Sequence, residues 1–402
     1  MNIQHPPESS RASKLIASGR RAARNILGPL YRPIRRVARF VTWIFPALGK
    51  LFLPIPANER RLLAIYDTSS QPFSVGDILI MQAASLALRE KHRVDLVDFA
   101  LVYDPRHPAS SDPAFARIRE DNAMYHLASI LPVAQVNQHL GSLFVFNSHS
   151  HLERFIADSA DLYHVWPSGW KYASRDYLYY AAFNEAFYEH YKDHGSIPQL
   201  SCRPFLREWA QTFYREHVHP HVPITVNVRN NKAFHTHRNL RLECWLDLFR
   251  HCETRYPAKF VVVCAWSEID DRLRECANVI IAKDYHTGIE QDLALINTSA
   301  IHLGAGSGPV TMAWFSNKPY LMVNTAYAPD HFSHPDMVVQ EEENIQRFWF
   351  AGPLQHIAGG VETTELLIRE FERMWGTVEV RLWQSPANID ADRGAEVPSW
   401  LR

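Results

Sequence analysis

Hydrophobic and polar positions along the chain follow two alternating patterns. Short apolar runs, typical of buried strands, are separated by longer stretches in which apolar residues recur every three or four positions, as in helices. In the first series the pattern predicts a strand over residues 62–66, a helix over 77–91 and a second strand over 94–99. We expect Gln82, Ser85 and Arg89 to form the main polar stripe of this helix, with its other faces buried. Such a unit predicts a parallel sheet covered by helices.

A second series of strand and helix patterns begins after His221. The two series together predict an α/β fold with two Rossmann-like domains that face a central cleft. We expect an N-terminal domain over residues 57–215, a C-terminal domain over 216–383 and a loose tail over 384–402. The second series predicts strands over residues 224–228, 260–264, 279–282, 300–304 and 320–323, with helices such as 239–255 and 289–297 between them.

The segment between the two series is rich in aromatic residues. It includes a predicted apolar strand over residues 143–146, followed by eight Trp, Tyr and Phe residues between Trp166 and Tyr191. Aromatic side chains at helical spacing favour packing in the core. The alternative is a stacking surface for sugar rings or lipid.

Composition places the chain among globular proteins. Of its 402 residues, 47% are hydrophobic and 21% are charged, which excludes a disordered or collagen-like chain. The five cysteines form no CxxC pair, so we expect a reducing compartment and no disulfide framework. The net charge of −1 conceals an asymmetry, because residues 1–50 carry ten Lys and Arg residues against one acid. A basic arm on an acidic body indicates an anionic partner for the arm.

The arm, residues 1–56, contains a basic amphipathic pattern. Four arginines fall on the face opposite an apolar stripe that runs from Leu30 to Leu48. The uncharged run between Arg39 and Lys50 is ten residues long, whereas a spanning helix needs about 20. We therefore predict that residues 11–50 lie on the anionic inner face of the plasma membrane and hold a cytoplasmic protein there. Packing of the arm on the protein's own body is the main alternative, and nucleic acid is disfavoured because the chain has no finger motif or aromatic-interleaved basic groove.

Ligands of open α/β sheets bind outside the carboxyl ends of the strands, so the loops after strands hold the candidate residues. The first loop contains Gly76 and Asp77. Glycine lets the chain turn closely, and the carboxylate of Asp77 can act as a general base for an acceptor hydroxyl. Asp is also common at helix N-caps, so a plain cap is the alternative for Asp77.

A glycine-rich turn follows the strand predicted over residues 300–304. Its sequence Gly-Ser-Gly-Pro, residues 306–309, places Gly306, Ser307, Gly308 and Pro309 before an apolar helix predicted over 310–315. Pro309 suits the first position of that helix, and glycines let backbone amides approach a diphosphate. We expect the backbone from Ser307 to Thr311 to bind that group. The alternative is a tight turn with no ligand.

Two further loops carry polar side chains at strand ends. Arg229 and Arg238 are predicted to stabilise a negatively charged leaving group, with a solvated loop as the alternative. Ser267 and Glu268, next to an aromatic residue, are candidates to hold a nucleobase. Neither the histidines at 217, 219 and 221 nor the Asp-Ala-Asp sequence at 390–392 indicates a metal site, because they lie in a predicted linker and in the tail. We therefore expect no metal site and no metal dependence.

These features resemble the GT-B glycosyltransferases, and among them the bacterial heptosyltransferase-like enzymes that build lipopolysaccharide and other surface glycans. The resemblance covers roughly residues 60–325. It implies that Asp77 is the catalytic base. The family's turn usually reads Asp-Thr-Gly-Pro-Ser-His, whereas Gly306 and Thr311 stand here at the Asp and His positions, and Ala83 stands where the family tends to have proline. Arg229 also resembles an arginine that meets the donor pyrophosphate in GT-B fucosyltransferases.

The resemblance implies an inverting, metal-independent glycosyltransferase. Its donor is a nucleoside-diphosphate sugar, bound as substrate with no further cofactor, and its acceptor is a lipid-linked or cell-surface glycan. Two alternatives remain open. One is a polysaccharide pyruvyl transferase, although the chain lacks the late Arg-x-His element of that family. The other is a non-catalytic membrane-associated scaffold of the same fold, for which the missing Asp and His are the evidence.

Overall fold

The structure is a computed structural model. It describes residues 60–68, 74–104, 123–168, 170, 177–232, 236–324, 338–342, 344–359, 362–379 and 383. The predictions for the basic arm, for the tail from residue 384 and for Asp390 and Asp392 lie outside these residues. The described residues belong to one compact unit that begins at Arg60.

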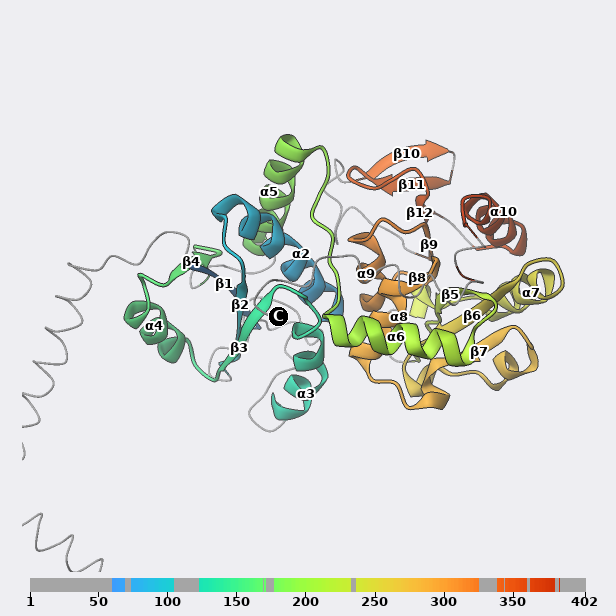
Figure 1. Cartoon of the computed structure of the whole chain (residues 1–402), viewed down its shortest axis with the longest axis horizontal. Coiled ribbons are helices and arrows are strands. Elements are labelled where there is room, and N and C mark those ends of the chain that lie inside the picture. The colour runs from blue at the N-terminus through green and yellow to red at the C-terminus, as the bar shows by residue number, and fades with distance from the viewer. Residues whose placement is uncertain are drawn as a thin grey trace, which may run out of the picture. The chain divides into compact units, whose positions relative to one another are not determined.

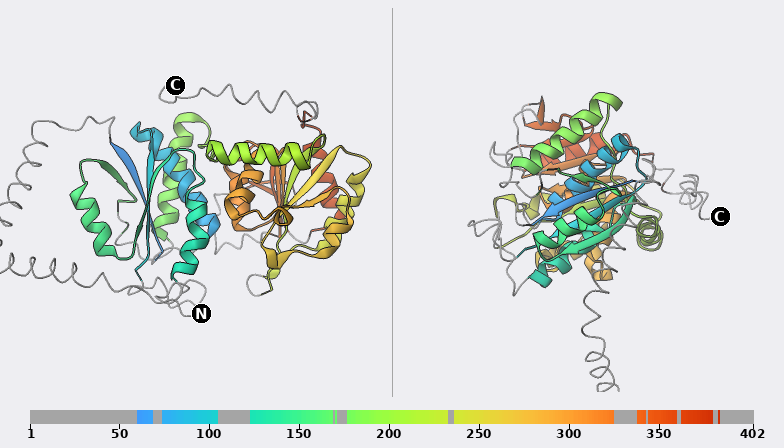
Figure 2. Two further views of the ribbon diagram at one scale, coloured as in Figure 1. Left: turned by 60° about the horizontal axis from the view of Figure 1, so that its bottom comes forward. Right: turned by 90° about the vertical axis from the view of Figure 1, so that its left-hand side faces the viewer.

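The first sheet has four parallel strands in the order β3-β2-β1-β4 (Figures 1 and 2). Helices cover both of its faces, with α2, α3 and α5 on one side and α4 on the other. The strands are β1 (Arg61–Asp67), β2 (Val97–Val102), β3 (Leu140–Phe146) and β4 (Tyr163–Trp166), and the helices are α2 (Val75–His92), α3 (Ala123–Ala134), α4 (His149–Asp158) and α5 (Tyr177–His194).

Helix α2 lies deep in the core and differs from its prediction. Its residues from Gly76 to Leu88 are all buried, including the polar Gln82 and Ser85. The Gln82 amide donates to the carbonyl of Val133 at 2.9 Å, and the Ser85 hydroxyl donates to the carbonyl of Gln82 at 2.7 Å. These two positions are therefore buried rather than solvent-exposed, because a hydrogen bond from Gln82 to α3 and one from Ser85 within α2 replace those to water.

The second sheet has eight strands in the order β10-β11-β12-β9-β8-β5-β6-β7. Six are parallel, and β10 and β11 extend the sheet in antiparallel fashion. Helices α7 and α10 pack on one face, and α8 and α9 on the other with α6 against α8. The elements are β5 (Val222–Asn227), β6 (Ala258–Val263), β7 (Val279–Ile281), β8 (Ile301–Ala305), β9 (Tyr320–Val323), β10 (Val338–Glu342), β11 (Ile345–Phe348) and β12 (Gln355–Ala358), with α6 (Pro204–His217), α7 (Leu242–Glu253), α8 (Ile289–Thr298), α9 (Thr311–Trp314) and α10 (Thr364–Trp375).

The α/β fold with two mainly parallel sheets confirms the predicted fold class. The prediction missed β4, which ends at Trp166 where the aromatic run begins, and it missed β10 to β12 and α10. Strand β4 has four half-buried residues and no alternating pattern, so its sequence carries little strand signal. All five cysteines are free thiols. Among the described helices, none is both long enough and apolar enough to cross a bilayer.

Candidate functional site

Asp77 lies in the first turn of α2, directly after β1. Ser74 is the N-cap, and its hydroxyl accepts a hydrogen bond from the Asp77 backbone N–H at 3.4 Å. The alternative that Asp77 itself caps the helix is therefore wrong, because Asp77 occupies the third helical position. Its side chain is buried, with 4% of the residue exposed. The positive end of an 18-residue helix dipole stabilises a carboxylate at this position.

The glycine turn before α9 packs directly against this end of α2. A Cβ atom added at Gly76 would lie 3.1 Å from Thr311 Oγ1 and 3.3 Å from Gly308 Cα. A Cβ atom added at Gly308 would lie 2.9 Å from Val75 Cβ, closer than packed side chains allow. The two glycines that the sequence analysis selected independently therefore allow the same close approach. They bring Asp77 and Thr311 to one place in the fold.

The helix that follows the glycine turn is shorter than predicted. Gly304, the residue before the last of strand β8, has φ of 156°, and an added Cβ there would lie 2.7 Å from the carbonyl oxygen of Asn227. A 3-10 turn over Gly308–Val310 follows, and α9 has only four residues, Thr311–Trp314. The prediction of one helix over 310–315 that begins at Pro309 is therefore wrong, because Pro309 lies inside the 3-10 turn. A macrodipole from so short a helix is weak, so individual amides are the donors that this turn offers.

Asn227 positions the turn, and the sequence analysis missed it. It is the last residue of β5 and is buried. Its amide donates to the carbonyl of Val263 at 3.0 Å, and its side-chain oxygen accepts a short hydrogen bond from the hydroxyl of Ser307. The sequence signal that could have identified Asn227 is its position as a polar residue at the end of a mainly apolar strand.

The cationic loop after β5 is closed by a pair of asparagines. The side-chain oxygen of Asn239 accepts from the Asn231 backbone N–H at 3.0 Å, and the Asn239 amide donates to the Asn231 carbonyl at 2.8 Å. In this loop the partly buried Arg229 and Arg238 lie close enough for the charge of Arg238 to act on Arg229. Burial lowers the pKa of Arg229, and the neighbouring charge of Arg238 lowers it further. An anion bound between the two arginines would offset both the burial of the Arg229 charge and its repulsion by Arg238.

Glu268 faces the same cations from the end of the next strand, β6. Its charge acts on Arg229 in the direction that raises the arginine pKa. Its carboxylate also accepts from the Ala265 backbone N–H at 3.3 Å, which holds the short turn that contains Ser267. Trp266 in that turn is 56% exposed, so its ring is accessible for stacking. The structure thus places Arg229, Arg238 and Glu268 together at the carboxyl end of the second sheet.

A buried ion pair follows β7, and sequence reasoning missed it. Lys283 Nζ lies 2.6 Å from Asp292 Oδ2 and also donates to the Thr287 carbonyl at 2.7 Å. The Thr287 hydroxyl donates to the second Asp292 oxygen at 2.7 Å. Burial raises the pKa of Asp292 to about 6, against the opposing effect of Lys283. The network ties the loop after β7 to the first turn of α8.

The carboxyl end of the first sheet carries a second group that sequence reasoning missed. His149 Nε2 lies 2.8 Å from Asp67 Oδ2, and the His149 backbone N–H donates to Asp104 Oδ2 at 3.2 Å. The hydrogen bond to Asp67 raises the pKa of His149, because the carboxylate stabilises the imidazolium. Asp67 ends β1, Asp104 follows β2 and His149 begins α4, so the group joins three strand ends.

Two other features lie apart from these residues. His217 packs against the ring of Tyr285 with centroids 4.2 Å apart, and His221 donates to the Val218 carbonyl at 3.3 Å. A cavity of about 430 Å³ opens between the end of α5 and the β11–β12 turn, and its walls include Tyr191, Trp314 and Phe350. None of the sequence-predicted site residues lines this cavity.

No protein-family model matches the sequence, and no curated protein matches it. Among solved structures, the chain is similar to a glycosyl transferase family 9 structure from Veillonella parvula, at 12% identity and a TM-score of 0.50 over 81% of this chain and 99% of that one. It is also similar to the ADP-heptose lipopolysaccharide heptosyltransferase II of E. coli, at 12% identity and a TM-score of 0.46 over 78% of this chain and 98% of that one. A third similar structure is the fucosyltransferase NodZ from Bradyrhizobium, at 12% identity and a TM-score of 0.32 over 64% and 93% of the two chains.

At this identity the first likeness shows the fold. It covers almost the whole of the Veillonella chain and agrees with the two sheets described above. The chain therefore has the GT-B fold, in a form similar to that family 9 glycosyltransferase structure.

Proposed function

We propose that this protein is a nucleotide-sugar-dependent glycosyltransferase that uses Asp77 as its base. The observation that carries the proposal is the contact between the start of α2 and the glycine turn, where Gly76 and Gly308 pack against each other. This contact brings a carboxylate close to the backbone amides that follow β8. Arg229 and Arg238 add positive charge at the carboxyl end of the same sheet. A base next to an anion-binding turn is the arrangement that sugar transfer from a diphosphate needs.

The reaction would proceed in one displacement. Asp77 accepts the proton of an acceptor hydroxyl while its oxygen forms a bond to the anomeric carbon of the sugar. The bond between that carbon and the diphosphate oxygen breaks, and the nucleoside diphosphate leaves with the electron pair. Amides from Ser307 to Thr311, together with Arg229 and Arg238, stabilise the charge on the leaving group. A single displacement inverts the anomeric centre and, with this charge stabilisation, needs no metal ion.

Hydrolysis of the donor tests this proposal. In the absence of acceptor, we expect the full chain to release a nucleoside diphosphate from one nucleotide sugar. We expect Arg238→Gln to raise KM for that donor at least about tenfold, because a hydrogen bond to a charged group contributes about 1.5–3 kcal/mol. Arg274→Gln is the matched control, since Arg274 pairs on the surface with Asp284 and should leave KM unchanged. An unchanged KM in Arg238→Gln would remove that residue from the donor site.

A non-catalytic scaffold is the second candidate. Gly306 and Thr311 stand where the heptosyltransferase-like turn carries Asp and His, so two side chains of that pattern are absent. Release of no nucleoside diphosphate from any donor would favour the scaffold over the enzyme.

We also propose that the acceptor is a lipid-linked or cell-surface glycan of a bacterium, and that the basic arm holds the protein on the inner face of the plasma membrane. The support is the arm's charge, ten bases against one acid in residues 1–50. In a sedimentation assay, we expect the full chain to pellet with anionic vesicles and a chain without residues 1–56 to stay in the supernatant. Equal pelleting of both chains would contradict the role of the arm.

A further inference from the structure

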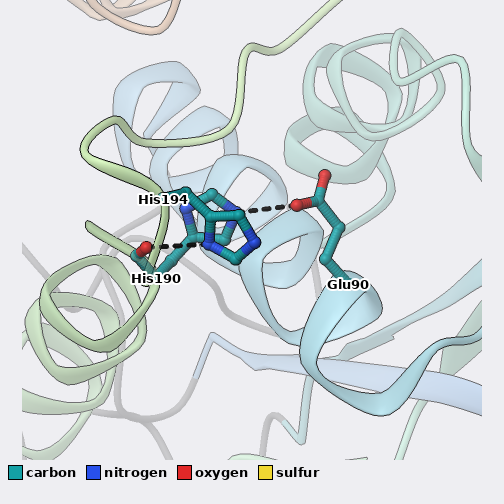
Figure 3. Close-up of side chains that lie close together, drawn as sticks. All are labelled: Glu90, His190 and His194. Carbon is teal, nitrogen blue, oxygen red and sulfur yellow. Dashed lines mark hydrogen bonds and ion pairs between the residues drawn. The ribbon is translucent and has the colours of Figure 1, made fainter. Parts of the chain in front are cut away.

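Glu90, His190 and His194 come together where α2 and α5 lie side by side (Figure 3). His190 and His194 are one helical turn apart on α5, and their rings stack with centroids 4.1 Å apart. Glu90 lies near the end of α2, and its Oε2 atom is 2.7 Å from His190 Nε2. One ligand atom from each residue lies within 4.8 Å of the other two.

The hydrogen bonds of the two histidines select which nitrogen faces Glu90. His190 Nδ1 donates to the carbonyl of Ser196 at 2.9 Å, and His194 Nδ1 donates to the carbonyl of His190 at 3.0 Å. Carbonyl oxygens only accept, so both Nδ1 atoms carry the proton. The Nε2 atoms, on the side of Glu90 (Figure 3), are therefore the nitrogens that can coordinate a metal ion. In His190 the ion would replace the Nε2 proton that otherwise makes the hydrogen bond to Glu90. Backbone carbonyls that fix the tautomer in this way are typical of metal-binding histidines.

We propose that Glu90, His190 and His194 form a binding site for a divalent transition-metal ion of the Zn²⁺ type. Two imidazole nitrogens and one carboxylate oxygen are a donor set that zinc accepts, with water in the fourth position. Tetrahedral ligands of one zinc ion lie about 3.3 Å apart, so a small rotation of exposed side chains closes the set. Glu90 and His194 are exposed and can rotate, whereas His190 is 8% exposed and provides the fixed ligand.

The position of the site assigns it a structural role. Glu90 follows Asp77 by thirteen residues on α2, which at 1.5 Å per residue separates them by about 20 Å. The ion therefore does not reach the reacting groups of the proposed transfer. It connects the last turn of α2 to the last turn of α5, two helices that pack on the same face of the first sheet. A bound ion would stabilise this helix pair without entering catalysis.

Zinc binding to the full chain, purified without a histidine tag and stripped by chelator, tests the proposal. Equilibrium dialysis should give one Zn²⁺ per chain at this site, and zinc at 100 times its dissociation constant should raise the unfolding midpoint by about 4 °C. Cobalt in place of zinc should produce visible absorption bands of a four-coordinate site, which an ordinary histidine–glutamate ion pair does not.

Two variants separate the metal site from a simple ion pair. His194→Ala removes an exposed ligand and keeps the His190–Glu90 hydrogen bond, so we expect the zinc dissociation constant to rise at least tenfold and the cobalt bands to vanish. The matched control is His251→Ala, because His251 also bridges two helices to a glutamate, Glu372 at 3.1 Å. It should bind zinc as the unchanged chain does. A His194→Ala dissociation constant within about threefold of the unchanged chain, or no zinc binding to the unchanged chain, would overturn the proposal.

Discussion

Replacing Asp77 by asparagine should lower the turnover number about 100-fold or more. The substitution keeps the size of the side chain and its place in the first turn of α2, but it removes the carboxylate that we propose accepts the hydroxyl proton. Binding of the donor should change little, since we propose that the turn after β8, Arg229 and Arg238 hold its diphosphate. The measurement is the steady-state rate of sugar transfer or donor hydrolysis, with kcat and KM determined separately.

The control separates the chemistry of Asp77 from its effect on the helix. An acid in the first turn of a helix stabilises it by about 0.3–1 kcal/mol through the helix dipole. Glu365→Gln removes such an acid from the first turn of α10, outside the proposed site. We expect both variants to lose a similar small amount of stability, and only Asp77→Asn to lose turnover. A kcat within about threefold of the unchanged protein would remove Asp77 from the mechanism.

Replacing Lys283 by methionine should lower the free energy of unfolding by about 3–5 kcal/mol. Lys283 and Asp292 are both buried, with 7% and 5% of their side chains exposed. The variant keeps the aliphatic volume but leaves the Asp292 carboxylate buried without its cation. Loss of one partner from a buried pair costs more than the pair itself contributes, because the remaining charge is not solvated. Urea unfolding of the full chain measures the effect.

The pH dependence of this loss of stability provides a second test of the buried ion pair. Burial already raises the pKa of Asp292 to about 6, and removal of Lys283 should raise it further. Since the folded state then binds a proton that the unfolded state releases, the deficit should shrink as the pH falls from 7 towards 4. Arg274→Met is the control, because the Arg274–Asp284 pair is more than 40% exposed and should contribute less than about 1 kcal/mol. Equal losses in the two variants would contradict the buried-pair account.

The sequence predicted the features that depend on local pattern. The strand runs of β1, β5, β6, β8 and β9 are mainly apolar and buried in the sheets, and their predicted bounds differ from the observed ones by no more than two residues. Gly76 and Gly308 were selected because each follows a strand, and the structure shows that they also contact each other. That contact is between residues more than 200 positions apart, so no local pattern carries it.

The residues that were missed depend on long-range pairing. His149, Asp67 and Asp104 come from three strand ends. Lys283 can be buried because it forms an ion pair with Asp292. Glu90 and His190 are 100 positions apart, so they meet only through the packing of α2 on α5. The histidines at 217 to 221 lie elsewhere, where His217 packs on Tyr285 and His221 bonds to the Val218 carbonyl.

The most direct test of a nucleotide-sugar site is the thermal unfolding midpoint of the full chain against ADP, UDP, GDP, CMP and their sugars, measured in the presence of EDTA. A ligand at 100 times its dissociation constant adds about 2.7 kcal/mol of stability. Our account predicts a clear rise for the diphosphate and sugar of one base, and a smaller rise when Arg238 is replaced by glutamine. No rise with any of them would contradict a nucleotide-sugar site and favour a scaffold, or a pyruvyl transferase that phosphoenolpyruvate stabilises instead.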